Sequence, residues 1–122
     1  MIKVIVKVTD IFVKESVCKP ILISVATDSL KNAQQISHQL LIQKLCACTH
    51  IHHSLSSYHW NNKLVEFQDE FVLEIKTIDL FFPQIEAIIL KNHPYSLPGI
   101  SYHTIDGGSK NYLKWIINIQ NQ

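Results

Sequence analysis

Residues 47–77, with the sequence ACTHIHHSLSSYHWNNKLVEFQDEFVLEIKT, decide the fold of this chain of 122 residues. At the centre of the segment, Asn61 and Asn62 tolerate the left-handed backbone that a tight hairpin turn requires. The residues before the turn have the pattern of a strand over about 47–60, and those after it predict a second strand over 63–77. We therefore expect a long antiparallel hairpin.

Upstream of the hairpin, the pattern predicts a buried strand followed by a helix. Residues 21–26 form a continuous apolar run, which is typical of a central strand. Asp28 or Ser29 is a suitable helix cap. Apolar side chains then recur at helical spacing as far as Leu45.

Downstream of the hairpin, the chain predicts a second helix, a last core strand and a final helix. Asp79 is a candidate cap, and Pro83 suits the first turn of a helix. Residues 98–105 have the pattern of a strand, and Ser109 is placed to cap the final helix. The order β-α-β-β-α-β predicts an α+β, ferredoxin-like sandwich with an added C-terminal helix.

The chain divides at residue 20. Residues 1–20 are interpreted as an N-terminal extension, in which Ile2, Val4, Val6 and Val8 alternate with other residues at strand period. This extension is either an extra edge strand or a loosely attached arm. Residues 21–119 form the single ferredoxin-like domain.

Composition excludes several classes of protein. A hydrophobic content of 47% argues against disorder. The formal net charge is only +1 and arginine is absent, so nucleic-acid binding is not expected. The odd number of cysteines, three, is not a secreted disulfide framework. The apolar N-terminal segment is interrupted by charges and is too short to span a membrane. We expect a cytoplasmic protein without membrane partners.

Cysteine and histidine gather at the start of the hairpin. Cys48, His50 and His52 alternate along a strand, so they share one face; Cys46 joins them if the strand starts early. Thiolate and imidazole suit copper or zinc, but the spacing is not that of a zinc finger. The alternative interpretation is a half-exposed strand face with no ligand role.

No arrangement of residues indicates an enzyme. The chain has no Gly-x-Ser-x-Gly nucleophile motif. Asp69 and Glu70 are neighbours on a strand, so they face opposite ways and cannot act as an acid/base pair. Gly107 and Gly108 precede Ser109 as a helix-capping turn rather than as a phosphate loop.

Large aromatic residues occupy a position where small polar ones are usual. Tyr58 and Trp60 lie beside the hairpin turn, which projects into water. Such side chains anchor interfaces, so we expect the tip to contact another surface. The alternative is packing between the two strands of the hairpin itself.

Several short segments follow one another in a specific order: Lys44-Leu45-Cys46-Ala47-Cys48, Ser57-Tyr58-His59-Trp60, Lys76-Thr77, His93-Pro94-Tyr95 with Pro98, and Gly108-Ser109 before Tyr112-Leu113-x-Trp115. Through these segments the chain resembles the CutA family of divalent-cation tolerance proteins over about residues 21–116. The resemblance implies the same fold and a tight homotrimer in which long hairpins reach neighbouring subunits. It places six residues at an interface or inter-subunit pocket: Tyr58, Trp60, Lys76, Tyr95, Tyr112 and Trp115.

The resemblance also implies a role in divalent metal tolerance, with copper as the associated ion and no metal needed for folding. Some bacterial members use a Cys in the first core strand and a His-His pair before Pro-Tyr. Here the corresponding residues are Val25, Asn92 and His93, so His93 is the candidate metal ligand. Cys48, His50 and His52 are the reserve candidates.

Two departures from the family pattern have structural consequences. Gly99 stands where Glu is usual after the second proline. An extra residue lies between Lys63 and Glu70, which predicts a β-bulge in the second hairpin strand.

Two other functions fit the same trimeric plan. A PII-like trimer would bind a small anion or nucleotide between subunits near Lys76, Tyr112 and Trp115. A purely structural scaffold would bind neither metal nor nucleotide. In all three cases the expected partner is another copy of the chain.

Overall fold

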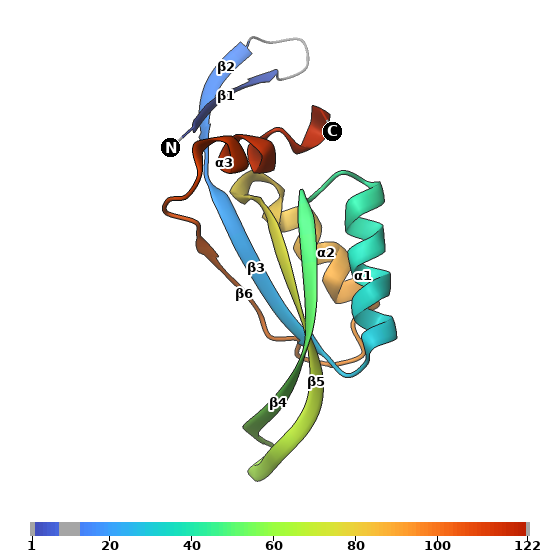
Figure 1. The fold of residues 1–122 in the computed structure, drawn as a ribbon. Coiled ribbons are helices and arrows are strands. Elements are labelled where there is room, and N and C mark those ends of the chain that lie inside the picture. The colour runs from blue at the N-terminus through green and yellow to red at the C-terminus, as the bar shows by residue number, and fades with distance from the viewer. Residues whose placement is uncertain (1, 8–12, 122) are drawn as a thin grey trace.

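The computed structural model describes residues 2–7 and 13–121 and contains a four-stranded antiparallel sheet with two long helices on one face and a third helix at one end (Figure 1). The strands, in spatial order, are β4 (Cys48–Trp60), β5 (Lys63–Ile78), β3 (Pro20–Thr27) and β6 (Ile100–Thr104). The helices are α1 (Leu30–Ile42), α2 (Phe82–Asn92) and α3 (Lys110–Ile117). The predicted α+β element order is confirmed.

The core lies between the sheet and the two helices α1 and α2. Alternate residues of β3, namely Ile21, Ile23 and Val25, are buried on the helix side. They pack against apolar residues of both helices, such as Ile36 and Ile89. Figure 1 shows that α1 and α2 leave the opposite face of the sheet uncovered along most of its length; we call it the open face.

The helix ends only partly follow the capping predictions. Ser29 caps α1, because its Oγ accepts a hydrogen bond from the Asn32 backbone N–H at 3.1 Å. Ser109 is the N-cap residue of α3 but its side chain makes no capping bond. The assignment of Asp79 as the α2 cap is wrong: it begins a 3₁₀ turn, η1 (Asp79–Phe81), and accepts a hydrogen bond from the Lys19 N–H.

The hairpin turn and the bulge are both confirmed. Asn61 and Asn62 have φ of 52° and 63°, the left-handed values of a two-residue hairpin turn. Ser56 pairs with Gln68 but Tyr58 pairs with Val65, so β5 carries one extra residue.

Phe67 takes up the irregularity of this bulge, with φ of 54°. A left-handed conformation costs a non-glycine residue roughly 1–2 kcal/mol. The Phe67 N–H donates to Ser57 Oγ at 3.1 Å, which keeps this backbone group satisfied.

The remaining elements lie at the other end of the sheet from the hairpin turn (Figure 1). Helix α3 packs Ile117 against Cys18 and Ile78, and is followed by a 3₁₀ turn, η2 (Ile119–Asn121). Strands β1 (Ile2–Lys7) and β2 (Val13–Cys18) pair only with each other among the described residues. The extension therefore does not lengthen the four-stranded sheet. Val8 lies outside the described residues.

Candidate functional site

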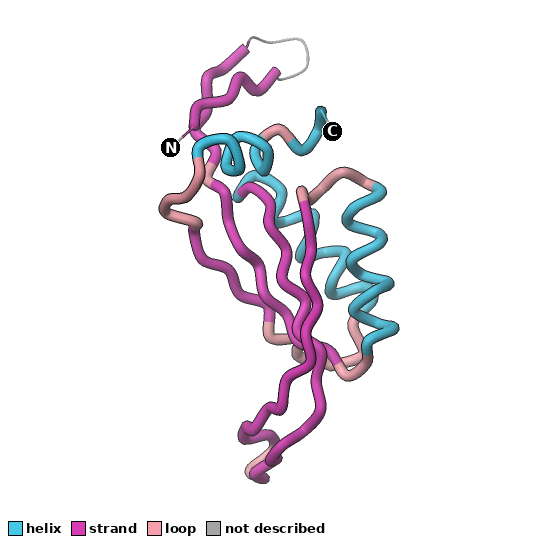
Figure 2. The backbone as a smooth tube through the Cα atoms, viewed as in Figure 1, coloured by secondary structure: helices cyan, strands magenta, loops and turns pink. Residues whose placement is uncertain are grey.

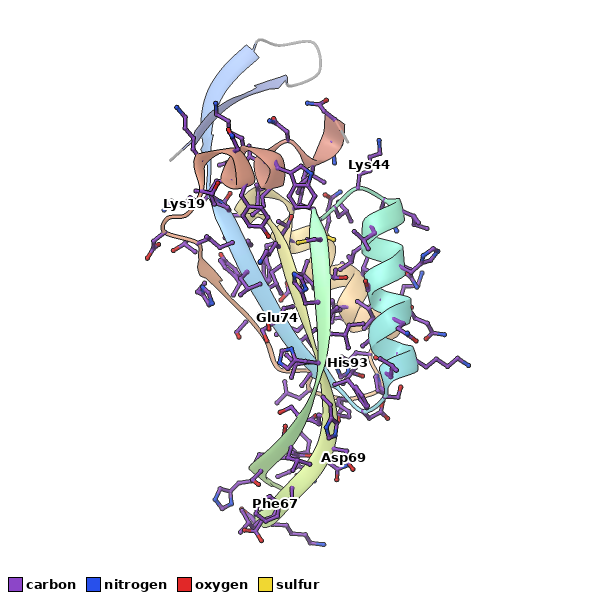
Figure 3. All side chains as sticks on the ribbon, in the orientation of Figure 1. Lys19, Lys44, Phe67, Asp69, Glu74 and His93 are labelled. Atoms are coloured by element: carbon purple, nitrogen blue, oxygen red, sulfur yellow. The ribbon has the colours of Figure 1, made fainter. Side chains whose placement is uncertain are left out.

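The end of the hairpin extends well beyond the helical layer, as Figure 2 shows. We call residues 54–69 the hairpin arm. Figure 3 places Phe67 and Asp69 on this arm, far from α3. Five large apolar side chains of the arm are exposed: Leu55, Tyr58, Trp60, Leu64 and Phe67. A concentration of exposed apolar groups on one projection is typical of a contact surface.

Cross-strand packing does not account for the aromatic pair at the tip. Trp60 stands opposite Lys63, and Tyr58 opposite Val65. Despite these neighbours, Trp60 is 44% exposed and Tyr58 is 37% exposed. Much of their apolar area therefore stays in contact with water in the single chain.

His93 is the C-cap residue of α2 and is buried, near the level where the hairpin arm leaves the body of the domain (Figure 3). The Tyr95 backbone N–H donates to His93 Nδ1 at 3.1 Å, so the ring proton belongs on Nε2. Nε2 lies 2.8 Å from the Ala26 carbonyl oxygen and donates to it. His93 thus ties the end of β3 to the loop after α2 as a neutral imidazole.

Metal ligation by His93 requires one of these hydrogen bonds to break, because a metal needs a free nitrogen lone pair. A buried backbone group left without its partner costs about 1–3 kcal/mol. The two residues at the other ligand positions of the family do not supply a metal ligand. Val25 is an apolar residue buried in the core, and Asn92 donates to the Ile88 carbonyl at 2.8 Å.

Cys48, His50 and His52 lie on the open face, as their alternation predicts. The intervening Thr49 faces the helices, where its Oγ1 lies 2.6 Å from Ser37 Oγ of α1. His52 Nδ1 lies 3.4 Å from Glu74 Oε1 on the neighbouring strand. Within the described residues, no three His, Cys, Asp or Glu side chains converge as a metal site.

Cys46 does not join that face. It is buried in the core, and burial first, then the nearby Cys48, raise its pKa from 9.0 to about 12. Its thiol stays protonated at neutral pH, so it is not activated as a nucleophile.

The structure brings three candidate residues together at the α3 end of the open face. Lys76 stands opposite Cys48 in the strand register, and its Nζ donates to Tyr112 Oη at 3.0 Å. This hydrogen bond is the main cause that raises the pKa of Lys76. The Tyr112 ring stacks on Trp115 at 5.8 Å, and Cys48 Sγ lies 3.8 Å from Tyr112 Oη.

Tyr95 lies near the root of the hairpin arm and contacts Glu70, which the sequence did not identify as a site residue. Its hydroxyl donates to Glu70 Oε2 at 2.8 Å. Burial and this hydrogen bond raise the pKa of Tyr95. Asp69 and Glu70 do face opposite ways: Asp69 pairs outward with His53 at 2.7 Å, and Glu70 is buried.

Beside Glu70 is a pocket of about 350 Å³. Its apolar lining includes Tyr58, Trp60, Tyr95 and Leu97. Sequence reasoning missed it because its residues come from four separate segments. The one local signal was an acidic residue directly preceding the apolar run 71–75.

Comparison with known proteins gives a consistent assignment. The model of the CutA1 divalent ion tolerance protein family matches residues 21–118. The chain is 34% identical over 97 residues to the divalent-cation tolerance protein CutA of Thermus thermophilus, covering 79% of this chain and 91% of that one. It is 30% identical over 98 residues to a probable cutA homolog of Encephalitozoon cuniculi, covering 80% and 85%.

Solved structures agree with the sequence match. The chain is similar to the periplasmic divalent cation tolerance protein CutA from Archaeoglobus fulgidus, with a TM-score of 0.76 and 32% identity over 80% of this chain and 94% of that one. The Thermus thermophilus structure gives a TM-score of 0.76 at 30% identity, covering 80% and 95%. This chain belongs to the CutA1 divalent ion tolerance protein family.

Proposed function

We propose that this protein acts in divalent-cation tolerance as a homotrimer, without catalysing a reaction. The observation that carries the proposal is the exposed apolar surface of the hairpin arm. A small domain leaves much of its surface uncovered, and association removes apolar area from water. The arm, projecting from the body, is placed to reach a second copy.

The two ends of the subunit support a ring rather than a two-fold dimer. The arm lies at one end of the sheet, while the half-exposed Tyr112 and Trp115 of α3 lie at the other. Contacts between unlike surfaces are heterologous, and they form a closed ring when the rotation is right. Three copies close such a ring in our proposal.

We place the metal, copper or another divalent cation, between subunits. The open face presents Cys48, His50 and His52, and these soft ligands suit copper. Residues two apart on a strand are roughly 6–7 Å apart, so about two of these side chains can converge on one ion. The strand of one chain therefore supplies too few ligands. Equivalent residues of neighbouring copies complete the set in this proposal. His93 remains the alternative ligand, at the cost of its hydrogen bonds.

The protein is proposed to work in the cytoplasm. Cys46 and Cys48 are free thiols, which a reducing compartment maintains. Among the described residues, no helix combines the length and apolar character needed to cross a membrane.

Calorimetric titration of the purified protein with Cu²⁺, Zn²⁺ and ATP tests the proposal. We expect metal binding that a Cys48→Ser, His50→Gln double variant abolishes. The exposed His38 on α1 provides the matched control, and His38→Gln should bind as wild type. Loss of binding in His93→Ala alone would move the site to His93.

The same titration separates the other two functions. ATP binding without a metal response would favour the ligand-sensing trimer, whose site would lie near Lys76, Tyr112 and Trp115. If the protein bound neither metal nor ATP, the purely structural scaffold would be the remaining function.

A further inference from the structure

The pocket beside Glu70 has a largely aromatic and apolar lining and a single carboxyl group. Its lining includes the aromatic rings of Tyr58, Trp60 and Tyr95, and Glu70 is its only ionisable acid or base besides the tyrosines. The pocket volume of about 350 Å³ falls within the range of small-molecule sites, roughly 300–1,000 Å³.

Glu70 is only half satisfied. The side chain is buried, with 6% of the residue exposed. Tyr95 Oη donates to Oε2, but none of the described residues places a donor at hydrogen-bond distance from Oε1. Lysine is absent from the pocket lining. Leaving one oxygen of a buried carboxylate without a donor or cation is unfavourable, so the site suits a positive ligand that reaches Oε1.

The walls select among cations. A divalent metal needs several oxygen, nitrogen or sulfur ligands, and the pocket offers one carboxylate. Aromatic faces attract organic cations through their quadrupoles. Leu97 and the rings also favour an apolar body behind the charge.

We propose that this pocket binds a small primary ammonium compound with an apolar body. The ammonium donates to Glu70 Oε1, and its remaining charge faces the rings of Tyr58 and Trp60. The apolar body lies against Leu97 and Tyr95. This site is separate from the Cys48, His50 and His52 surface and takes a different class of ligand.

Gly99 also lines the pocket. A Cβ built at Gly99 meets no atom within 4 Å, so a larger side chain there is accommodated without a clash. Gly99→Leu is therefore the variant chosen to narrow the pocket without changing Glu70.

The test uses 2-phenylethylammonium and its neutral counterpart of the same shape, 2-phenylethanol. Tyr58 and Trp60 also belong to the proposed subunit contact, so this proposal rests on a trimer whose contact leaves the pocket faces of both rings open. The titration is therefore made on the intact oligomer. Binding is followed by the indole N–H resonance of Trp60 and the backbone resonances of Glu70 and Gly99. We expect the ammonium to bind more tightly than the alcohol by about tenfold, the usual effect of a hydrogen bond to a charged group.

Two variants make the result decisive. Glu70→Gln keeps an oxygen for the Tyr95 hydroxyl but removes the charge, so it should weaken the ammonium about tenfold and leave the alcohol unchanged. Gly99→Leu should block both compounds while the protein keeps its wild-type melting temperature. Equal affinity for the two compounds, no response of Trp60, or ammonium binding unaffected by both variants would overturn the proposal.

Discussion

Replacing Trp60 by alanine should weaken assembly by an amount that follows from its exposure. A large aromatic side chain buries up to about 250 Å², and Trp60 is 44% exposed in the single chain. Coverage by a neighbour would therefore remove up to roughly 110 Å² of mostly apolar surface from water, worth at most about 2–3 kcal/mol per subunit.

A trimer contains three such contacts, so the substitution should cost roughly 6–9 kcal/mol per trimer. This is about four to six powers of ten in the association constant. Because that constant varies with the square of the monomer concentration, half-dissociation should shift to a protein concentration roughly 100 to 1,000 times higher.

Sedimentation velocity over a dilution series, with guanidinium chloride added where the wild type does not dissociate, measures this shift. Leu90→Ala is the matched control, because Leu90 is an exposed apolar residue on α2, away from the arm. It should dissociate as wild type. Dissociation of Trp60→Ala and wild type at the same concentration would refute the assignment of the arm as a subunit contact.

Two further predictions concern buried groups within the subunit. His93→Ala should lower the free energy of unfolding by about 1–3 kcal/mol, because the Ala26 carbonyl and the Tyr95 N–H lose their partner; denaturant unfolding that matches wild type would contradict this role. The Cys46 thiol has a pKa raised from 9.0 to about 12 in the folded protein, so its stabilising contribution is complete below pH 9 and is lost as pH rises toward 12. Unfolding of wild type and Cys46→Ala between pH 8 and 11 (roughly the window set by that shift) should show a steeper loss of stability in wild type, and parallel curves would show that Cys46 is not buried as a thiol.

Local patterns predicted the elements whose causes are local. Asn61 and Asn62 specified the hairpin turn because few other residues adopt two successive left-handed conformations. The apolar run 21–26 specified the central strand β3, and one surplus residue before Glu70 specified the bulge. Alternation along β4 correctly put Cys48, His50 and His52 on one face.

The features that local patterns did not predict depend on contacts between segments that are distant in the sequence. His93 is fixed by the carbonyl of Ala26, 67 residues earlier, a partner that no local pattern identifies. Tyr95 meets Glu70 across 25 residues. Strand β2 is rich in charged and polar residues, so it has no apolar pattern that would predict a strand. Its pairing with β1 defines it as one.

The mass of the wild-type protein in solution tests the central claim most directly. Multi-angle light scattering on the purified protein at micromolar concentration should give a single species of three times the 14.0 kDa chain mass. A stable species at the mass of one chain would contradict the account, because the exposed side chains of the hairpin arm would then have no partner copy to cover them.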